Sequence, residues 1–146
     1  MSDTSVVLDC GAFWSKAGVA GETSPRRLFP SVLGRLQEKS PAEMYANYQA
    51  AESCTRRGLL ILKNPIVSGV VADWDTMEAV WRSAFQDELR VSPQEHPVLL
   101  TEAVMTPPVT REKTAEIFLE TFGSPAPHIA PQASLSLLAS HKTRGR

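Results

Sequence analysis

The fold is decided by residues 6–20, which read Val6-Val7-Leu8-Asp9-Cys10-Gly11-Ala12-Phe13-Trp14-Ser15-Lys16-Ala17-Gly18-Val19-Ala20. An apolar, β-branched run ends at Leu8, polar and glycine positions interrupt it, and Lys16 opens a second apolar run. This pattern predicts two short strands around a tight turn. A glycine turn lets backbone N–H groups approach a phosphate, and a lysine and a carboxylate nearby can serve phosphate and hydrated metal. An anion site, if the chain has one, is expected at this hairpin.

The composition limits the class of protein. The chain has 146 residues, enough for one domain, and its 15 lysines and arginines nearly balance 16 aspartates and glutamates. Such a balance gives no reason to expect nucleic acid or an anionic membrane as a partner. The 2 cysteines are too few for a disulfide framework, and no stretch has the pattern of a membrane span or a signal peptide. We therefore expect an intracellular protein.

Short strands and an irregular insertion are predicted for the first half of the chain. A third apolar run over residues 27–33 follows the hairpin, with a proline that places it at an edge or a bulge. Residues 36–57 are polar and aperiodic, and we interpret them as a mobile insertion. Residues 58–66 contain a strand-like run that stops at Pro65.

The second half alternates between helical and strand patterns. Asp73 precedes apolar residues spaced three and four apart, which predicts a helix that ends near Arg90. A short apolar run over residues 96–101 predicts a strand buried on both faces, and the helices around it predict parallel crossovers. The remaining predicted elements are a helix over 110–122 closed by Gly123, a strand over 127–130 and a helix over 132–140 with Leu135, Leu138 and Ala139 on one face.

Several segments, in this order, are distinctive of one protein family. They are Pro25-Arg26, Phe29-Pro30-Ser31-Val32-Leu33-Gly34-Arg35, Lys63-Asn64-Pro65-Ile66, Trp74-Asp75-Thr76-Met77-Glu78-Ala79-Val80-Trp81, Glu95-His96-Pro97-Val98-Leu99-Leu100-Thr101-Glu102-Ala103 and Arg111-Glu112-Lys113. Through them the chain resembles actin and the actin-related proteins over nearly its whole length. The resemblance implies an α/β fold of the actin-like ATPase (ribonuclease H-like) kind. In it, residues 1–35 are the strand meander, 36–57 a degenerate mobile outer-subdomain insertion, and 58–146 the continuation in helices and parallel strands.

The resemblance also implies an incomplete fold. The family places a second phosphate hairpin and the purine-binding half of its fold beyond the position where this chain stops. We therefore expect apolar surface on Leu135, Leu137 or Leu138 and an unpaired strand edge. Such a surface predicts self-association or a protein partner.

The resemblance places a phosphate loop on the opening hairpin. The family pattern is Asp-Asn-Gly-Ser-Gly, two variable residues and Lys, and Asp9, Gly11 and Lys16 keep three of these cofactor-binding positions. Ala12 lacks the hydroxyl that contacts the terminal phosphate. Phe13 replaces the second glycine, and a positive φ costs such a residue about 1–2 kcal/mol. The loop is therefore expected to be degenerate, and ATP with Mg is the cofactor only if the loop is still competent.

Gln132 falls on the family position that orients the attacking water, and it is the catalytic position that the resemblance carries over. A glutamine amide can align a water by hydrogen bonds. The alternative is a solvated residue in the first turn of a helix, which we favour because of the changes in the loop. We expect no bound cofactor and no ATP hydrolysis.

The remaining acidic, aromatic, cysteine and histidine side chains are expected to have structural roles. Asp73, Asp75 and Glu78 lie at a helix start, where carboxylates cap the helix and complement its dipole, so no metal site is expected. Trp74 and Trp81 share one helix face and are expected in the core. Cys10 and the scattered histidines are expected to be structural.

We expect a divergent actin-related protein that acts as a cytoskeletal or complex-associated structural or interaction subunit. Its expected partners are proteins, either actin-like subunits or a multiprotein complex, with no direct nucleic acid and no membrane. The expected localisation is cytoplasmic and cytoskeletal, with the nucleus as the alternative. Two other interpretations stay open: a nucleotide-binding actin homologue that polymerises, and a non-functional truncated product of an actin-like gene.

Overall fold

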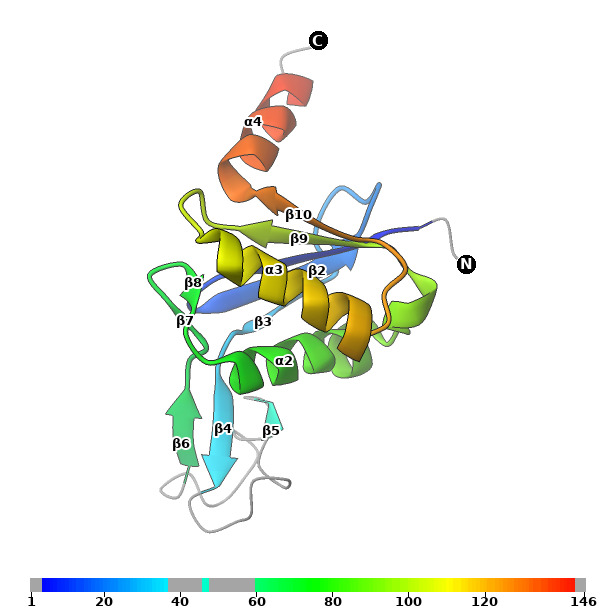
Figure 1. Cartoon of the computed structure of the whole chain (residues 1–146). Coiled ribbons are helices and arrows are strands. Elements are labelled where there is room, and N and C mark those ends of the chain that lie inside the picture. The colour runs from blue at the N-terminus through cyan, green and yellow to red at the C-terminus, as the bar shows by residue number, and fades with distance from the viewer. Residues whose placement is uncertain (1–3, 37–45, 48–59, 144–146) are drawn as a thin grey trace.

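The computed structural model describes residues 4–36, 46–47 and 60–143 and contains a five-stranded mixed sheet (Figure 1). The strand order is β10-β9-β1-β2-β3. The strands are β1 (Val6–Cys10), β2 (Trp14–Val19), β3 (Arg27–Pro30), β9 (Val98–Glu102) and β10 (Pro127–Pro131). β1, β9 and β10 run parallel, whereas β2 is antiparallel to both of its neighbours. The predicted α/β class and the parallel crossovers are thus confirmed.

The opening hairpin forms as predicted. β1 and β2 pair so that Asp9 lies opposite Lys16. The Gly11 N–H closes the turn by donating to the Trp14 carbonyl at 3.0 Å. A Cβ on Gly11 would lie 3.0 Å from that carbonyl oxygen, so the close approach of the two strands favours glycine here.

The predicted strand over residues 27–33 is divided between two sheets, which corrects that prediction. β3 ends at Pro30, and β4 (Leu33–Leu36) pairs with β5 (Ala46–Asn47) and β6 (Leu60–Lys63) in a separate sheet. The chain changes sheets at Ser31, which is fully buried and donates its N–H to the Phe13 carbonyl at 2.9 Å. Most of the predicted insertion over 36–57 lies outside the described residues.

The strand-like run predicted over residues 58–66 contains β6, and the strand ends before Pro65, as predicted. β6 stops at Lys63, and the next strands are a short hairpin of β7 (Ile66–Val67) and β8 (Val70–Val71). The Asn64 side chain spans the break, because it donates to the Ala12 carbonyl and accepts the Ile66 N–H at 3.0 Å. The β7–β8 hairpin is thereby held beside the turn between β1 and β2.

Two helical segments follow the predicted patterns. α2 (Trp74–Ser83) begins after Asp73, whose carboxylate accepts the Thr76 N–H at 3.0 Å, and continues as the π-helical η3 (Ala84–Leu89). α3 (Pro108–Glu116) continues as η5 (Ile117–Thr121), and Gly123 follows with a φ of +64°. The 3-10 turn η4 (Pro93–Glu95) connects η3 to β9. The predicted cap at Asp73 is confirmed.

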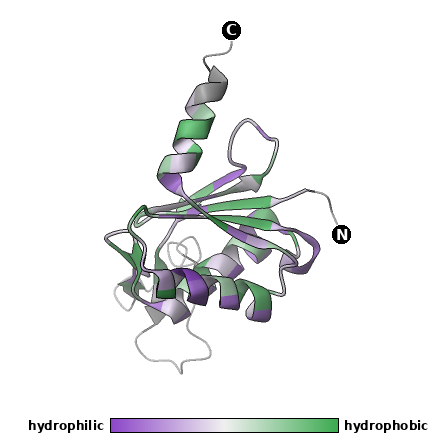
Figure 2. Cartoon of the chain, turned by 45° about the horizontal axis from the view of Figure 1, so that its top comes forward, coloured by the Kyte–Doolittle hydropathy of each residue, from purple (hydrophilic) through white to green (hydrophobic). Residues whose placement is uncertain are grey.

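Both helical segments pack on the same face of the sheet, as Figures 1 and 2 show from two directions. Val98 and Leu100 of β9 are buried on that face. Leu99 and Thr101, which alternate with them and face the other side of the sheet, are only partly buried. The expectation that β9 is buried on both faces is therefore wrong. The reason is that α2 and α3 cover only one side of the strand.

The core between the sheet and the helices is aromatic. Trp81 and Phe118 meet edge to face with ring centroids 4.9 Å apart, and Phe122 lies 5.1 Å from Phe118. Trp81 is 3 % exposed, which confirms the predicted core position. Trp74 is partly buried, and the Lys113 ammonium lies 5.3 Å from its ring centroid.

α4 (Gln132–Thr143) extends away from the sheet in both views. Leu137 and Leu138 are 60 % and 64 % exposed, in agreement with the apolar surface expected there. The helix begins at the predicted residue and is longer than predicted. Among the described helices, none has the length and apolar character needed to cross a membrane.

Candidate functional site

The carboxyl ends of three parallel strands bring the candidate site residues together. Leu8 of β1 lies opposite Leu100 of β9, so the next residues along these strands, Asp9 and Thr101, are neighbours. β10 continues the sheet on the other side of β9 and leads directly into Gln132. In open α/β sheets, this edge is where ligands bind.

Asp9 is the centre of a hydrogen-bond network at this edge. Its Oδ1 accepts from Thr101 Oγ1 at 2.6 Å and from Gln132 Nε2 at 2.8 Å. Its Oδ2 accepts from Lys16 Nζ at 3.0 Å. The structure therefore joins Asp9, Lys16 and Gln132, three of the residues that the sequence singled out, and adds Thr101.

The charge of Asp9 is stabilised by these contacts. Burial alone raises the pKa of Asp9, but the hydrogen bonds from Thr101, Lys16 and Gln132 outweigh it and hold the pKa below its ordinary value. The carboxylate is thus ionised at neutral pH and paired with the Lys16 ammonium. An incoming anion would meet a lysine whose charge already has a partner.

In the turn between β1 and β2, the carbonyl oxygens accept hydrogen bonds and the tip is exposed to solvent. The Ala12 carbonyl accepts from the Asn64 side chain, and the Phe13 carbonyl accepts from Ser31. Within the described residues, the N–H groups of Ala12 and Phe13 have no acceptor. No residue of the turn has a positive φ, so the expected conformational cost at Phe13 does not arise in this backbone. The Phe13 side chain is 75 % exposed.

The other candidates have structural partners. Burial raises the pKa of the Cys10 thiol to about 11, so it is neutral at physiological pH. Asp73 caps α2 and pairs with Lys63, and Glu78 pairs with Arg82. In the described part of the chain, no cluster of three acidic, histidine or cysteine residues could hold a metal ion.

Thr101 is the site residue that sequence reasoning missed. Its position after a buried, parallel strand was the available signal, because such strand ends meet at one edge of the sheet. Gln132 is an exposed residue in the first turn of α4, as in the favoured interpretation, and its side chain is nevertheless bonded to Asp9.

Comparison with protein families gives one match that covers nearly the whole chain. The family model for actin matches residues 2–145. The mixed sheet with helices on one face agrees with the actin-like, ribonuclease H-like architecture that the sequence implied.

Proposed function

The chain belongs to the actin family, and we propose that it acts as a structural or interaction subunit that does not hydrolyse ATP. The fold of the family is that of ATPases, so the proposal depends on what this chain has changed in the phosphate turn. Its partners are proposed to be proteins, either actin-like subunits or a multiprotein complex, in the cytoplasm and cytoskeleton.

The observation that carries the proposal is the chemistry of the turn. The tip presents the ring of Phe13, 75 % exposed, where a phosphate cradle needs close access to the backbone. Ala12 offers no hydroxyl. Lys16 and Gln132 both bond to Asp9, so a phosphate would have to compete with that carboxylate for the groups that should hold it.

Exposed apolar side chains near this edge support a protein partner. Phe13 and Trp14 on the hairpin are 75 % and 54 % exposed. Val104 and Met105, which follow β9, are 63 % and 89 % exposed. Aromatic residues and methionine are enriched in protein interfaces, and exposure of their apolar surface to water is unfavourable. The carboxyl edge thus has the side chains of a contact surface.

A nucleotide-binding homologue that polymerises is the second candidate. The observation in its favour is that Asp9, Lys16, Thr101 and Gln132 are already assembled within hydrogen-bond distance. The unpaired N–H groups in the turn would also suit an anion.

Thermal unfolding with Mg-ATP separates the two candidates. If the chain bound Mg-ATP with a dissociation constant of about 10 µM, about 1 mM Mg-ATP would stabilise the folded state by about 2.7 kcal/mol. Such a change would raise the melting temperature by several degrees. We expect no shift for the native chain relative to Mg²⁺ alone, and no phosphate release. The variant Ala12→Ser/Phe13→Gly restores the family residues at the two altered positions of the tip and is the matched comparison. A shift of several degrees in the native chain would overturn the proposal.

Sedimentation with actin filaments tests the interaction role directly. We expect the chain to bind without ATP and Phe13→Ser to weaken that binding. Leu119→Ser is the control, because Leu119 is 52 % exposed but lies on η5, in the helical layer and not on the hairpin. Equal effects of the two substitutions would remove the turn from the contact surface.

A further inference from the structure

A cavity of about 200 Å³ lies between the sheet and the two helical segments. Its walls come from β1, β9 and β10, from the β7–β8 hairpin, and from α2 and α3. Cys10, Gly11 and Ala12 of the phosphate turn also line it, together with Gln132, whereas Asp9 and Lys16 do not, so the cavity adjoins the turn but not the Asp9–Lys16 pair.

Most of the cavity wall is apolar. Leu8, Met77 and Trp81 contribute to it, together with Ile66, Leu100 and Ile129. An apolar cavity of about 150 Å³ stays dry and takes up benzene, so the space here suits a ring compound somewhat larger than benzene.

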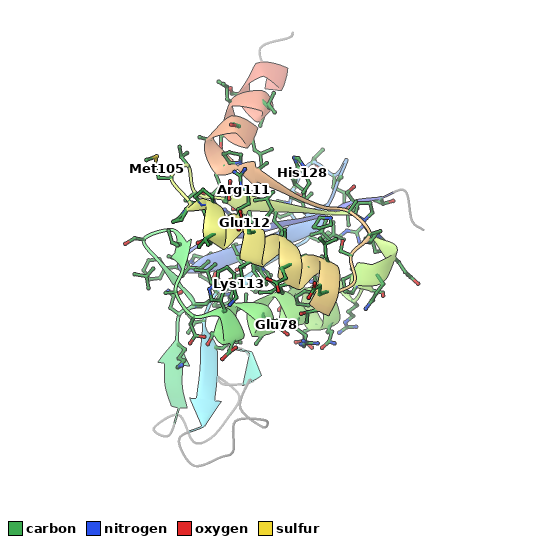
Figure 3. The ribbon with its side chains drawn as sticks, in the orientation of Figure 1. Glu78, Met105, Arg111, Glu112, Lys113 and His128 are labelled. Atoms are coloured by element: carbon green, nitrogen blue, oxygen red, sulfur yellow. The ribbon has the colours of Figure 1, made fainter. Side chains whose placement is uncertain are left out.

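The edge of the molecule beside the cavity is apolar as well. Ala103 lines the cavity, and its Cβ lies 3.1 Å from the position of a Cβ on Gly69, so the loop after β9 meets the β7–β8 turn. Val67 on that turn is 60 % exposed, and Met105 on the loop before α3 is 89 % exposed (Figure 3). Exposed apolar side chains therefore border the cavity.

Two side chains of the wall, Glu102 and Gln132, contain oxygens that can accept a hydrogen bond. The Glu102 side chain is 9 % exposed, and one of its oxygens accepts from Arg111 of α3. The other, Oε2, is buried and has no partner among the described residues. Gln132 donates through Nε2 to Asp9 and Thr101, and no described residue donates to its Oε1. A buried acceptor without a donor is costly, and a ligand N–H would relieve that cost.

We propose that this cavity binds a small, flat, apolar ring compound that carries one N–H donor and has the size of indole. The ring packs between Met77 and Trp81 on one side and the sheet on the other. The N–H points to the polar end that Glu102 and Gln132 form. The inference goes beyond the proposed subunit role, because it concerns the space between the sheet and the helices and not the Asp9–Lys16 pair.

Methyl NMR of the native chain, labelled at methionine, tests the proposal with indole as the probe. Met77 lines the cavity and is 1 % exposed, whereas Met105 is 89 % exposed, so one spectrum contains the reporter and its control. We expect the Met77 methyl to shift saturably with a dissociation constant below about 1 mM and by more than the Met105 methyl, which lies outside the cavity. Benzofuran, which replaces the N–H by an oxygen, should bind about tenfold more weakly. No Met77 shift, or equal affinity for benzofuran, would overturn the proposal.

Two substitutions on α3 locate the site independently. Thr110 is 8 % exposed and lines the cavity, so Thr110→Leu fills part of the space. Val109 is 71 % exposed, so Val109→Leu enlarges a neighbouring side chain in solvent. We expect Thr110→Leu to weaken indole binding at least about tenfold and Val109→Leu to leave it unchanged. If Thr110→Leu binds indole as tightly as the native chain does, the cavity is not the binding site. If Thr110→Leu does not fold, the Met77 titration of the native chain alone decides the question.

Discussion

Gln132 donates its side-chain N–H to Asp9 Oδ1 at 2.8 Å, although 123 positions separate the two residues in the chain. This contact ties the start of α4 to the end of β1. Thr101 donates to the same oxygen at 2.6 Å, so a single carboxylate oxygen joins the ends of β1 and β9 to the helix that follows β10. Asp9 therefore has a structural role at this edge, whether or not a nucleotide binds there.

Removal of the Asp9 carboxylate should destabilise the chain. We expect Asp9→Ala to lower the free energy of unfolding by about 1–3 kcal/mol, because Thr101 and Gln132 lose a charged acceptor. Lys16→Met removes only the ion pair, in which the Lys16 and Asp9 side chains are 50 % and 28 % exposed, and should cost less than about 1 kcal/mol. Urea unfolding of both variants measures the difference. Equal losses would mean that the ion pair, and not the hydrogen bonds, stabilises the edge.

The same network makes stability depend on pH. The pKa of Asp9 is lower in the folded chain than its ordinary 3.8, so the folded state binds fewer protons than the unfolded state in this range. The stabilisation is fully present above the unfolded pKa and is lost as the pH falls through the folded pKa. We expect the native chain to lose stability between about pH 5 and pH 2 more steeply than Asp9→Ala. Urea unfolding over this range is the measurement, and parallel curves would contradict the network.

Local patterns in the sequence located most of the elements. The cap of α2 could be predicted because Asp73 needs only the N–H of Thr76, three positions further on. Thr101 could not be identified in this way. Its place beside Asp9 depends on the parallel register in which Leu8 lies opposite Leu100, and no local pattern encodes that register.

Tertiary contacts also explain the errors in the strand predictions. Residues 27–33 form one apolar run in the sequence, yet pairing with β2 ends at Ser31, which bonds the Phe13 carbonyl and the Ser15 hydroxyl, and from Leu33 the chain pairs with β6 instead. The strain expected at Phe13 assumed a glycine-like turn, whereas the turn here contains no positive φ. Hydrophobic periodicity reveals neither the contacts of Ser31 nor the backbone conformation of the turn.

Loss of the α2 cap should have a measurable cost of its own. We expect Asp73→Ala to lower the free energy of unfolding by about 1 kcal/mol, because the Thr76 N–H loses its acceptor. Asp75→Ala is the matched control, since Asp75 is exposed in the first turn and contributes only through the helix dipole, worth about 0.3–1 kcal/mol. Hydrogen exchange of the first turn of α2 should accelerate in Asp73→Ala only. Acceleration in both variants would assign the effect to charge instead of capping.

Phe118 should be the most sensitive core position tested. It is fully buried, and its ring centroid lies 4.9 Å from that of Trp81 and 5.1 Å from that of Phe122. Its ring therefore packs η5 against α2. We expect Phe118→Ala to cost about 3–5 kcal/mol, because the surrounding rings cannot close the space that it leaves.

The next residue provides the control for that loss. Leu119 is 52 % exposed, so Leu119→Ala also truncates a large apolar side chain on η5 but one that faces water, and should change the free energy of unfolding by less than about 1 kcal/mol. Urea unfolding compares the two, and the near-ultraviolet circular dichroism of Trp81 should weaken in Phe118→Ala alone. Because η5 carries both residues, an equal loss would show that helix stability, and not the aromatic packing between η5 and α2, determines the effect.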